Sequence, residues 1–263
     1  MNIIVCIKQV PNTNEVKINQ ETGTLIRDGV PSIINPDDKN AIEAALQLRE
    51  INGGKVTVIS MGPPQAKEAL KEAYAMGADE VYLVSDKAFG GSDTWATATV
   101  LAAVIKKIGN YDIIFCGRQA IDGDTAQVGP EIAEFLDIPQ VTYAKYIEDK
   151  GKNFVITRKT EGADYIIETS KPVLITAIQD LNKPRYPQVK RIFEVYASND
   201  IVKTWTSEDI PVDLTQIGLK GSPTNVYSSF VPTKEKHSEI IDGTDKNEKA
   251  EKLLDKLKAA GVI

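Results

Sequence analysis

One stretch of small, acidic and hydroxyl residues has the composition of a phosphate-binding loop. Residues 117–130 read GRQAIDGDTAQVGP and lie between an apolar run at residues 111–116 and a helical pattern at residues 130–136. Where a strand leads through such a loop into a helix, the unpaired amides of the first turn and the helix dipole favour an anion. The stretch therefore predicts a phosphorylated cofactor bound at the carboxyl end of a strand.

A second stretch with similar residues lies earlier in the chain. Residues 89–94 read FGGSDT and join a predicted strand at residues 80–84 to a predicted helix at residues 94–108. Free amides and hydroxyls at this point could bind a pyrophosphate or a ribityl group. Ser, Asp and Thr are also the usual residues that cap a helix, so a cap without any ligand is the alternative explanation.

The sequence gives few signs of other chemistry. His237 is the only histidine, and we expect it to be an ordinary surface residue. Cys6 and Cys116 each end an apolar strand pattern, which predicts small buried thiols in a reducing compartment. Without histidine clusters or metal-type cysteine spacing, the sequence predicts no metal site. It also has no GxSxG motif that would indicate nucleophilic catalysis.

Composition narrows the class of protein. The chain has 263 residues, of which 42% are hydrophobic and 26% charged, as in an ordinary soluble protein. A net charge of -6 gives no electrostatic reason to expect nucleic acid or an anionic membrane as a partner. No apolar run approaches the roughly 20 residues of a membrane span, and residues 1–8 lack the basic region of a signal peptide. We therefore expect a cytoplasmic protein without membrane insertion.

Strand and helix patterns alternate through the first half of the chain. The predicted strands are residues 2–7, 55–60, 80–84 and 112–116, and the predicted helices are residues 37–49, 64–76, 94–108 and 130–136. This alternation implies parallel strands joined by right-handed crossovers. The predicted fold class is α/β, a doubly wound, mainly parallel, Rossmann-like sheet.

Two segments depart from this rhythm. The long connection before residue 37 contains a candidate hairpin at residues 16–18 and 24–29, and a loop of this length is usually functional. After Pro139 the apolar pattern changes to a period of two, which predicts an antiparallel hairpin extension of the sheet. The strands predicted for this extension are residues 141–143, 154–158, 165–168 and 173–176.

The sequence divides into a predicted core domain and a predicted arm. Residues 1–198 form the expected nucleotide-binding α/β domain, and residues 199–263 form a C-terminal arm that ends in a helix at residues 245–259. A disordered tail is the alternative, but the arm holds many large apolar residues, such as Trp205, Tyr227 and Phe230. The sequence therefore predicts an arm that wraps around a partner.

Motifs along nearly the whole chain resemble the beta subunits of electron-transfer flavoproteins. Besides GRQAIDGDTAQVGP, they are VCIKQVP at residues 5–11, INPDD at 34–38, SMGPP at 60–64, AMGAD at 75–79, TRKTEG at 157–162, KPVLIT at 171–176 and LNKPRY at 181–186. The resemblance implies a Rossmann-like fold of the adenine-nucleotide alpha hydrolase type. It also implies a heterodimer with an alpha subunit that carries FAD.

The family contains two kinds of beta subunit. In housekeeping members it holds a structural AMP and serves acyl-CoA dehydrogenases. In electron-bifurcating members it holds a second FAD, which accepts a hydride from NADH. The two electrons then go separately to the alpha-subunit FAD with an acyl-CoA dehydrogenase-like flavoenzyme, and to ferredoxin or flavodoxin. The sequence of residues 89–94 resembles the corresponding segment of the bifurcating members. FAD is therefore the predicted cofactor, and AMP is the alternative.

A rival of another class is a stand-alone ATP-using or nucleotide-sensing domain. Such a domain needs no flavin partner, and this chain lacks the P-loop lysine motif. A long C-terminal arm would also have no use in a stand-alone sensor, so this class is disfavoured.

The resemblance also implies roles for individual residues. Cys6 would border the adenosine, Met61 would lie beside the nucleotide, and Asn35, Pro36 and Asp37 would close over the adenine or ribose. The remaining predicted cofactor-binding residues are Gly90, Gly91, Ser92, Asp93, Thr94, Ile121, Asp122, Gly123, Asp124, Thr125, Ala126, Gln127, Val128 and Gly129.

Charge complicates the role of two residues in the phosphate-binding loop. Asp122 and Asp124 would repel a phosphate, so we expect them to cap the helix or to accept sugar hydroxyls. Arg118 would either tune the flavin or anchor the loop, and the sequence does not separate these roles.

A further loop resembles the segment by which these proteins recognise an acyl-CoA dehydrogenase. Its predicted partner-docking residues are Leu181, Asn182, Pro184, Arg185 and Tyr186. Pro184 stiffens a loop that we expect to present one apolar and one cationic side chain. A purely structural turn is the alternative.

Overall fold

The computed structural model describes residues 1–12, 31–198, 200–227 and 238–263. The chain forms two compact units, Met1–Tyr227 and Ser228–Ile263, and each is described here by itself. The predicted hairpin at residues 16–18 and 24–29 and the lone His237 lie outside the described residues.

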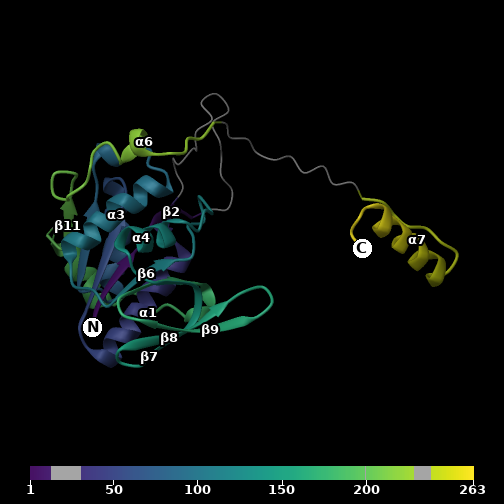
Figure 1. Ribbon diagram of the computed structural model, residues 1–263, viewed down its shortest axis with the longest axis horizontal. Helices are drawn as coiled ribbons and strands as arrows, with labels where there is room; N and C mark the ends of the chain where they lie inside the picture. Colours follow the sequence, from purple (N-terminus) through teal and green to yellow (C-terminus); the bar gives the residue numbers. More distant parts are fainter. Residues whose placement is uncertain (13–30, 199, 228–237) are drawn as a thin grey trace. The chain divides into compact units, whose positions relative to one another are not determined.

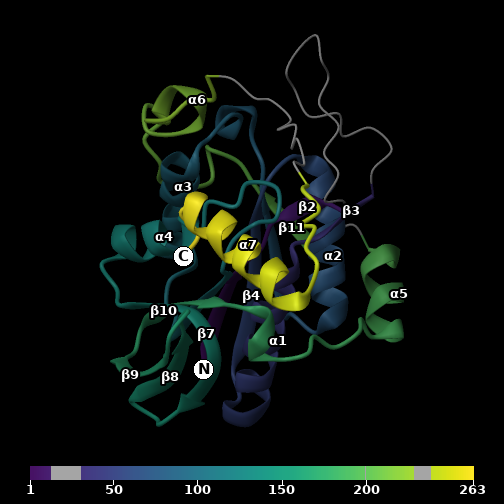
Figure 2. The same ribbon diagram turned by 90° about the vertical axis from the view of Figure 1, so that its right-hand side faces the viewer.

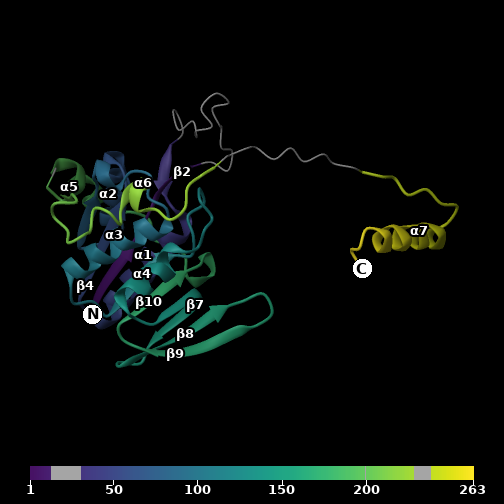
Figure 3. The ribbon, with the colours of Figure 1, turned by 45° about the horizontal axis from the view of Figure 1, so that its top comes forward.

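The first unit is built on one nine-stranded sheet (Figure 1). In spatial order its strands are β11 (Val202–Trp205), β5 (Glu80–Val84), β4 (Lys55–Met61), β1 (Asn2–Cys6), β6 (Ile113–Gly117), β10 (Val173–Ala177), β7 (Gln140–Asp149), β8 (Asn153–Lys159) and β9 (Asp164–Ser170). Every pair from β11 to β7 is parallel. The pairs β7–β8 and β8–β9 are antiparallel and form a projecting ladder (Figure 3).

Helices cover both faces of the parallel part (Figure 2). One face carries α1 (Pro36–Asn52) and α2 (Lys67–Met76), whose buried residues share a hydrophobic cluster with β1, β4 and β6. The other face carries α3 (Thr94–Ile108) and α4 (Val128–Leu136) over a second cluster. The doubly wound, mainly parallel sheet predicted from the alternating pattern is confirmed.

Short elements complete the first unit. β2 (Gln9–Pro11) and β3 (Ser32–Ile34) pair in antiparallel fashion on either side of the long connection. α5 (Val189–Ala197) packs beside α2. The remaining short helices are η1 (Pro64–Ala66), η2 (Lys87–Phe89), η3 (Gln179–Leu181) and α6 (Gly218–Gly221).

The strand predicted at residues 173–176 does not extend the antiparallel ladder. It forms β10, which is inserted between β6 and β7 and is parallel to both. All five residues of β10 are buried, as expected for a parallel strand covered on both faces. Only β7, β8 and β9 form the predicted antiparallel extension, because a period of two does not reveal which strand a segment pairs with.

The sheet also continues beyond the predicted end of the core domain at residue 198. β11 pairs in parallel with β5 at the edge of the sheet, and the first unit ends at Tyr227. The sequence prediction contained neither β11 nor α5. β11 has only four residues, and α5 buries just one side chain, Val195.

The second unit contains one helix, α7 (Lys246–Ala259), close to the bounds predicted from the sequence. The Asp245 carboxylate caps it by accepting hydrogen bonds from the amides of Asn247 and Glu248. No residue of α7 is buried, and Leu253 and Leu254 are 46% and 43% exposed. Its apolar face is therefore not covered by the rest of its own unit.

Candidate functional site

The middle of the sheet contains the point where the chain reverses its lateral direction. From β1 it moves through α1, β4, α2 and β5 toward one edge, and α3 then returns it to β6 on the other side of β1. β1 and β6 are parallel neighbours, with Cys6 opposite Cys116 at their carboxyl ends. Open α/β sheets bind ligands in the crevice outside such a switch point. The loops after β1 and β6 therefore border the candidate site.

Two thiols lie at the carboxyl ends of these two strands. Cys6 and Cys116 are free and buried, as predicted, and belong to the cluster on the α3 and α4 side of the sheet. A hydrogen bond with Cys6 and burial both raise the pKa of the Cys116 thiol well above its ordinary value. Cys116 therefore stays protonated near neutral pH and is unsuited to act as a nucleophile.

The two aspartates of the β6–α4 loop bind residues of the chain itself. The Lys8 ammonium donates to both oxygens of Asp122, at 2.7 and 2.9 Å. The Gln119 amide donates to Asp124 at 2.7 Å. The expectation that these aspartates cap α4 is wrong, because its N-cap residue is Gln127 and no side chain caps it. Their carboxylates hold the loop in place, and the alternative that they accept sugar hydroxyls stays a prediction.

The backbone of this loop leaves several consecutive amides without an acceptor among the described residues. Asp124 and Ala126 have φ angles of 50° and 53°, in the left-handed region that residues other than glycine rarely adopt. Among the described residues, no acceptor receives a hydrogen bond from the amides of residues 125–129. Consecutive free amides that lead into a helix N-terminus form a concave anion site.

Two glycines of the loop have different reasons for being glycine. A Cβ on Gly129 would lie 2.9 Å from Thr176 Cγ2 and 3.5 Å from Cys116 Cβ, so α4 needs glycine to approach the sheet. A Cβ on Gly123 would have no atom within 4 Å. The fold of the chain therefore does not require glycine at position 123.

Residues 90–93 are held by α6 and the chain after it. A Cβ on Gly91 would lie 3.1 Å from Leu219 Cβ, and the amide of Leu219 donates to the carbonyl of Gly90 at 3.0 Å. Ser92 Oγ accepts a hydrogen bond from the amide of Gly218 at 3.1 Å. The space beside Gly91 is therefore occupied by the chain itself.

Asp93 is the N-cap of α3, as the capping interpretation predicts. One carboxylate oxygen accepts a hydrogen bond from the amide of Ala96 at 3.0 Å. The other accepts two from Thr224, at 2.9 Å from its amide and 2.8 Å from its hydroxyl. These contacts lower the pKa of Asp93 against the opposing effect of burial. Contact of residues 90–94 with a cofactor stays a prediction.

Glu131 links the two helices on this side of the sheet. Its Oε1 accepts a hydrogen bond from Thr94 Oγ1 at 3.0 Å, while its buried Oε2 has no partner among the described residues. Burial raises the pKa of Glu131, and the neighbouring Asp93 raises it further. Glu131 could not be selected from the residue pattern, because acidic residues are common in a first helical turn.

The remaining residues predicted to cover the nucleotide lie at the start of α1 and the end of β4. Asn35 is buried and serves as the N-cap residue of α1, and Pro36 is the first helical residue. Asp37 is also buried, which raises its pKa despite the Arg118 guanidinium 3.4 Å away. Met61 is partly buried against the cluster below α3.

Arg118 faces a cavity beside β7. The cavity has a volume of about 640 Å³, and its lining residues include Asp37, Arg118, Tyr143, Arg158 and Asp180. The backbone amide of Arg118 also donates to the carbonyl of Ala177 at 2.8 Å. Arg118 thus anchors the start of the loop through both its backbone and its ion pair with Asp37.

The predicted docking loop is only partly exposed. Leu181 packs against the cluster below α1, and Asn182 exchanges hydrogen bonds with Asn40. Arg185 is not a free cation, because it is paired with two glutamates of α1, Glu43 and Glu50. These contacts correct the expectation of an exposed apolar and cationic pair at Leu181 and Arg185.

Exposed apolar side chains lie immediately after this loop. Tyr186 is 89% exposed. On α5, Val189, Phe193 and Tyr196 are exposed at helical spacing. Pro184 is only partly exposed. The surface available to a partner is thus formed by Tyr186 and the face of α5.

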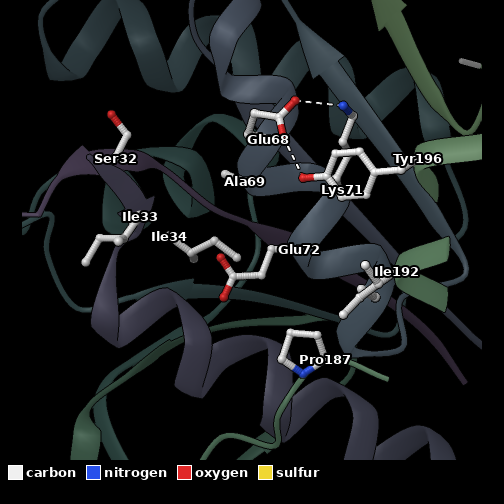
Figure 4. Close-up of a pocket in the computed structure, with 11 residues that line it drawn as sticks. Ser32, Ile33, Ile34, Glu68, Ala69, Lys71, Glu72, Pro187, Ile192 and Tyr196 are labelled. Carbon is white, nitrogen blue, oxygen red and sulfur yellow. Dashed lines mark hydrogen bonds and ion pairs between the residues drawn. The ribbon is translucent and has the colours of Figure 1, made fainter. Parts of the chain in front are cut away.

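A second cavity lies between β3, α2 and α5 (Figure 4). It has a volume of about 320 Å³, and its apolar lining includes Ile34 and Ile192. At its rim the Glu68 carboxylate accepts hydrogen bonds from Lys71 and from the Tyr196 hydroxyl, both at 2.7 Å. Its charged groups are thus paired within the chain.

Two kinds of feature are absent from the part of the chain that the structure describes. It contains no group of three or more His, Cys, Asp or Glu side chains placed to hold a metal ion. It also contains no helix with the length and apolar character needed to cross a membrane.

Comparison with known proteins identifies the family. The electron transfer flavoprotein domain matches residues 22–200. The chain is 57% identical over 263 residues to electron transfer flavoprotein subunit beta of Thermoanaerobacterium thermosaccharolyticum, with full coverage of both chains.

Two other similar proteins belong to named complexes. Over the full length of both chains, this chain is 51% identical to caffeyl-CoA reductase-Etf complex subunit CarD of Acetobacterium woodii. With the same coverage, it is 50% identical to acryloyl-CoA reductase electron transfer subunit gamma of Anaerotignum propionicum. The domain match and the shared length agree, and the chain belongs to the electron transfer flavoprotein family as a beta subunit.

Proposed function

We propose that this beta subunit binds FAD in the crevice between β1 and β6 and belongs to an electron-bifurcating complex that oxidises NADH. The observation that carries the proposal is the row of free amides at residues 125–129 beside the switch point. Two similar proteins are named as parts of caffeyl-CoA reductase and acryloyl-CoA reductase systems. Their names support a flavoenzyme of the acyl-CoA dehydrogenase type as partner.

The residues of the crevice fit a dinucleotide at its phosphates. The amides of residues 125–129 would bind the phosphate oxygens, and the open space at Gly123 admits a close approach to the backbone. Cys6 and Met61 would contact the adenosine, and Asn35 and Pro36 would border it from α1. Lys8 and Asp122 tie the two bordering loops together and so limit their movement.

The bound FAD would supply the ring that accepts a hydride and passes on single electrons. The chain itself contributes binding, orientation and the exclusion of water. The proposed electron acceptors are the FAD of the alpha subunit, which serves the flavoenzyme, and a low-potential carrier such as ferredoxin or flavodoxin.

A housekeeping electron carrier with AMP in this crevice is the second candidate. One observation favours it: Ser92 and Asp93 make hydrogen bonds with residues 218–224 rather than presenting free groups to a longer cofactor. An AMP would need only the loop at residues 123–129 and the end of β1 at Cys6. In this case the acyl-CoA dehydrogenase would be the electron donor.

Cofactor analysis of the purified heterodimer separates the two candidates. The proposal expects two FAD per heterodimer and reduction of flavin by NADH. One FAD with one AMP, and no reduction by NADH, would establish the housekeeping carrier instead. Nucleotide extraction followed by chromatography and an anaerobic NADH titration measure these quantities.

We further propose that the predicted loop, with the surface that follows it, docks the flavoenzyme partner. Leu181 and Asn182 fix the loop to the core, and Arg185 is locked to α1. Tyr186 then projects almost completely into solvent at the start of the exposed apolar face of α5. Large aromatic side chains at the centre of an interface contribute much of the binding energy.

Replacing Tyr186 with alanine should slow electron transfer to the flavoenzyme without disturbing the flavins. Loss of an interface anchor costs about 2 kcal/mol, so KM for the flavoenzyme should rise about 30-fold. Diaphorase activity with a small artificial acceptor should persist, since among the described residues no hydrogen bond joins Tyr186 to the proposed cofactor site. Steady-state kinetics with both acceptors measure the difference.

Tyr165→Ala is the matched control for this measurement. Tyr165 is 57% exposed and lies on β9, away from α5. The Tyr165→Ala variant should leave KM for the flavoenzyme unchanged. An equal loss of both activities in Tyr186→Ala would show that this loop has only a structural role.

A further inference from the structure

One buried carboxylate joins the two strands that meet at the switch point. Asp38, in the first turn of α1, is only 5% exposed. Its Oδ2 accepts a hydrogen bond from the amide of Lys8 at 2.7 Å, and its Oδ1 accepts one from the amide of Gly117 at 3.0 Å. Lys8 follows β1 and Gly117 ends β6, so Asp38 fixes the start of both bordering loops.

The contact continues from Asp38 to the middle of the β6–α4 loop through Asn35. The Nδ2 group of Asn35 donates to Asp38 Oδ1 at 3.1 Å and to the carbonyl of Gln119 at 2.9 Å. Its Oδ1 accepts a hydrogen bond from the amide of Ile121 at 3.1 Å. Asn35 is the N-cap residue of α1, but its side chain makes no capping bond. The Asn35 side chain forms its hydrogen bonds with the β6–α4 loop instead.

The backbone around Asp38 leaves no room for another arrangement. A Cβ on Gly117 would overlap both Asp38 Oδ1 and the backbone of α1. The Asn35 amide also donates to the carbonyl of Lys8 at 2.9 Å, which holds the start of α1 against the end of β1. The Asp38 carboxylate and the Asn35 side chain therefore have fixed positions relative to β1 and β6.

We propose that Asp38 is a positioning residue for the nucleotide: acting through Asn35, its carboxylate sets the position of residues 119–129 and thereby the affinity for the phosphates of an adenine nucleotide. This inference rests on the proposed function, in which that loop binds the phosphates. It concerns a residue that need not touch the ligand.

The protonation state of Asp38 controls these contacts. Burial raises the pKa of Asp38 to about 7, with a small further rise from Asp37, while the hydrogen bonds from Lys8, Asn35 and Gly117 oppose the rise. The ionised carboxylate accepts bonds on both oxygens. A proton on either oxygen would face an N–H donor, so protonation removes one of the hydrogen bonds that Asp38 accepts from Lys8, Asn35 and Gly117.

Other charged groups near Asp38 are engaged elsewhere. The Arg118 guanidinium faces Asp37, and the Lys8 ammonium binds Asp122. From β6, the Cys116 thiol has a pKa well above its ordinary value and stays neutral. We therefore expect nucleotide affinity to fall as the pH falls through about 7.

The contribution of Asp38 to the stability of the fold has the opposite sign. Its pKa in the folded protein lies above the ordinary value, so the proton stabilises the folded state. This contribution is present at low pH and is lost as the pH rises through about 7. If Asp38 affected affinity only through the stability of the fold, nucleotide affinity and stability would change in the same direction with pH. We expect them to change in opposite directions.

The test compares the wild-type heterodimer with Asp38→Asn, both depleted of nucleotide, by calorimetric titration with AMP. The asparagine side chain has one donor where the carboxylate has an acceptor, so it imitates the protonated state. At pH 8 the dissociation constant of the variant should be at least about tenfold above that of the wild type. The ratio of the two dissociation constants, variant over wild type, should approach one at pH 6. Because AMP itself titrates in both measurements, its effect on affinity cancels in this ratio.

Asp112→Asn is the matched control. Asp112 Oδ2 accepts a hydrogen bond from the amide of Asn2 at 2.7 Å, so it ties the same two strands at their opposite ends. This variant should lower the melting temperature and leave AMP affinity unchanged at both pH values.

The outcomes distinguish this inference from the function on which it rests. If the wild type binds neither AMP nor, in the same titration, FAD, the proposed nucleotide site is wrong and the inference fails with it. If it binds only FAD, the ratio of dissociation constants is taken with FAD. If the wild type binds AMP and the ratio is one at pH 8, or does not change with pH, the inference alone is overturned.

Should Asp38→Asn fail to fold, Asn35→Ala replaces it. This variant keeps the carboxylate but cuts its link to Gln119 and Ile121. Asn35→Ala must show the same loss of AMP affinity at pH 8. Its dissociation constant must also approach that of the wild type at pH 6. Wild-type affinity in Asn35→Ala would overturn the proposal.

Discussion

Replacing Gly123 with valine should empty the nucleotide crevice while the protein remains folded. An added Cβ at this position meets no atom of the chain within 4 Å, so the fold has room for it. The proposed phosphates lie against the same backbone, and forcing extra atoms into a packed contact costs about 1–3 kcal/mol. Nucleotide affinity should therefore fall about 5- to 150-fold. Cofactor content after gel filtration and the melting temperature measure the two effects.

Gly162→Val provides the control for this variant. Gly162 lies in the turn between β8 and β9 and also has no atom within 4 Å of an added Cβ. This control should keep both its cofactor and its melting temperature. Full cofactor content in Gly123→Val would remove the β6–α4 loop from the site.

Removing residues 228–263 should abolish stable pairing with the alpha subunit. We propose that this unit is the part of the C-terminal arm that wraps the partner, since no residue of α7 is buried. Residues 200–227, which the sequence also assigned to the arm, pack instead with the first unit through β11. The truncated chain should keep its melting temperature because its core clusters are intact. Co-purification with a tagged alpha subunit measures the pairing.

Point substitutions on α7 test the same idea without a deletion. Leu254→Asn should weaken pairing by about 2 kcal/mol, or about 30-fold in dissociation constant, if this leucine is buried in the heterodimer. Lys258→Asn, on the same helix, should leave pairing unchanged. Normal co-purification of the truncated chain would show that the arm has no role in assembly.

The parallel core of the fold could be predicted from local patterns. α3 and β5 have the predicted bounds, because the apolar periodicity and the capping residues of these segments agree. The prediction gave β10 as a strand but with the wrong pairing, and it missed β11 and α5. The place of β10 between β6 and β7 depends on a partner remote in sequence, and local periodicity contains no information about pairing.

The candidate site could be predicted in part. Residues 117–130 were recognisable from their residue types and from their position between a strand and a helix. Asp38 was not, because an acidic residue in a first helical turn is usually a solvated one. Its burial arises only when α1 packs over the end of β6, where Gly117 has no side chain to displace it.

The sequence by itself determined the strands and helices of the parallel core and the loop that would bind phosphate, because each depends on residues close together in the chain. Tertiary structure alone decided that β1 and β6 are neighbours and that Cys6 lies opposite Cys116. It also decided that residues 218–224 occupy the hydrogen-bonding groups beside Gly91. These arrangements follow from the crossover of α3 and the return of the chain after β11, which bring together residues more than a hundred positions apart.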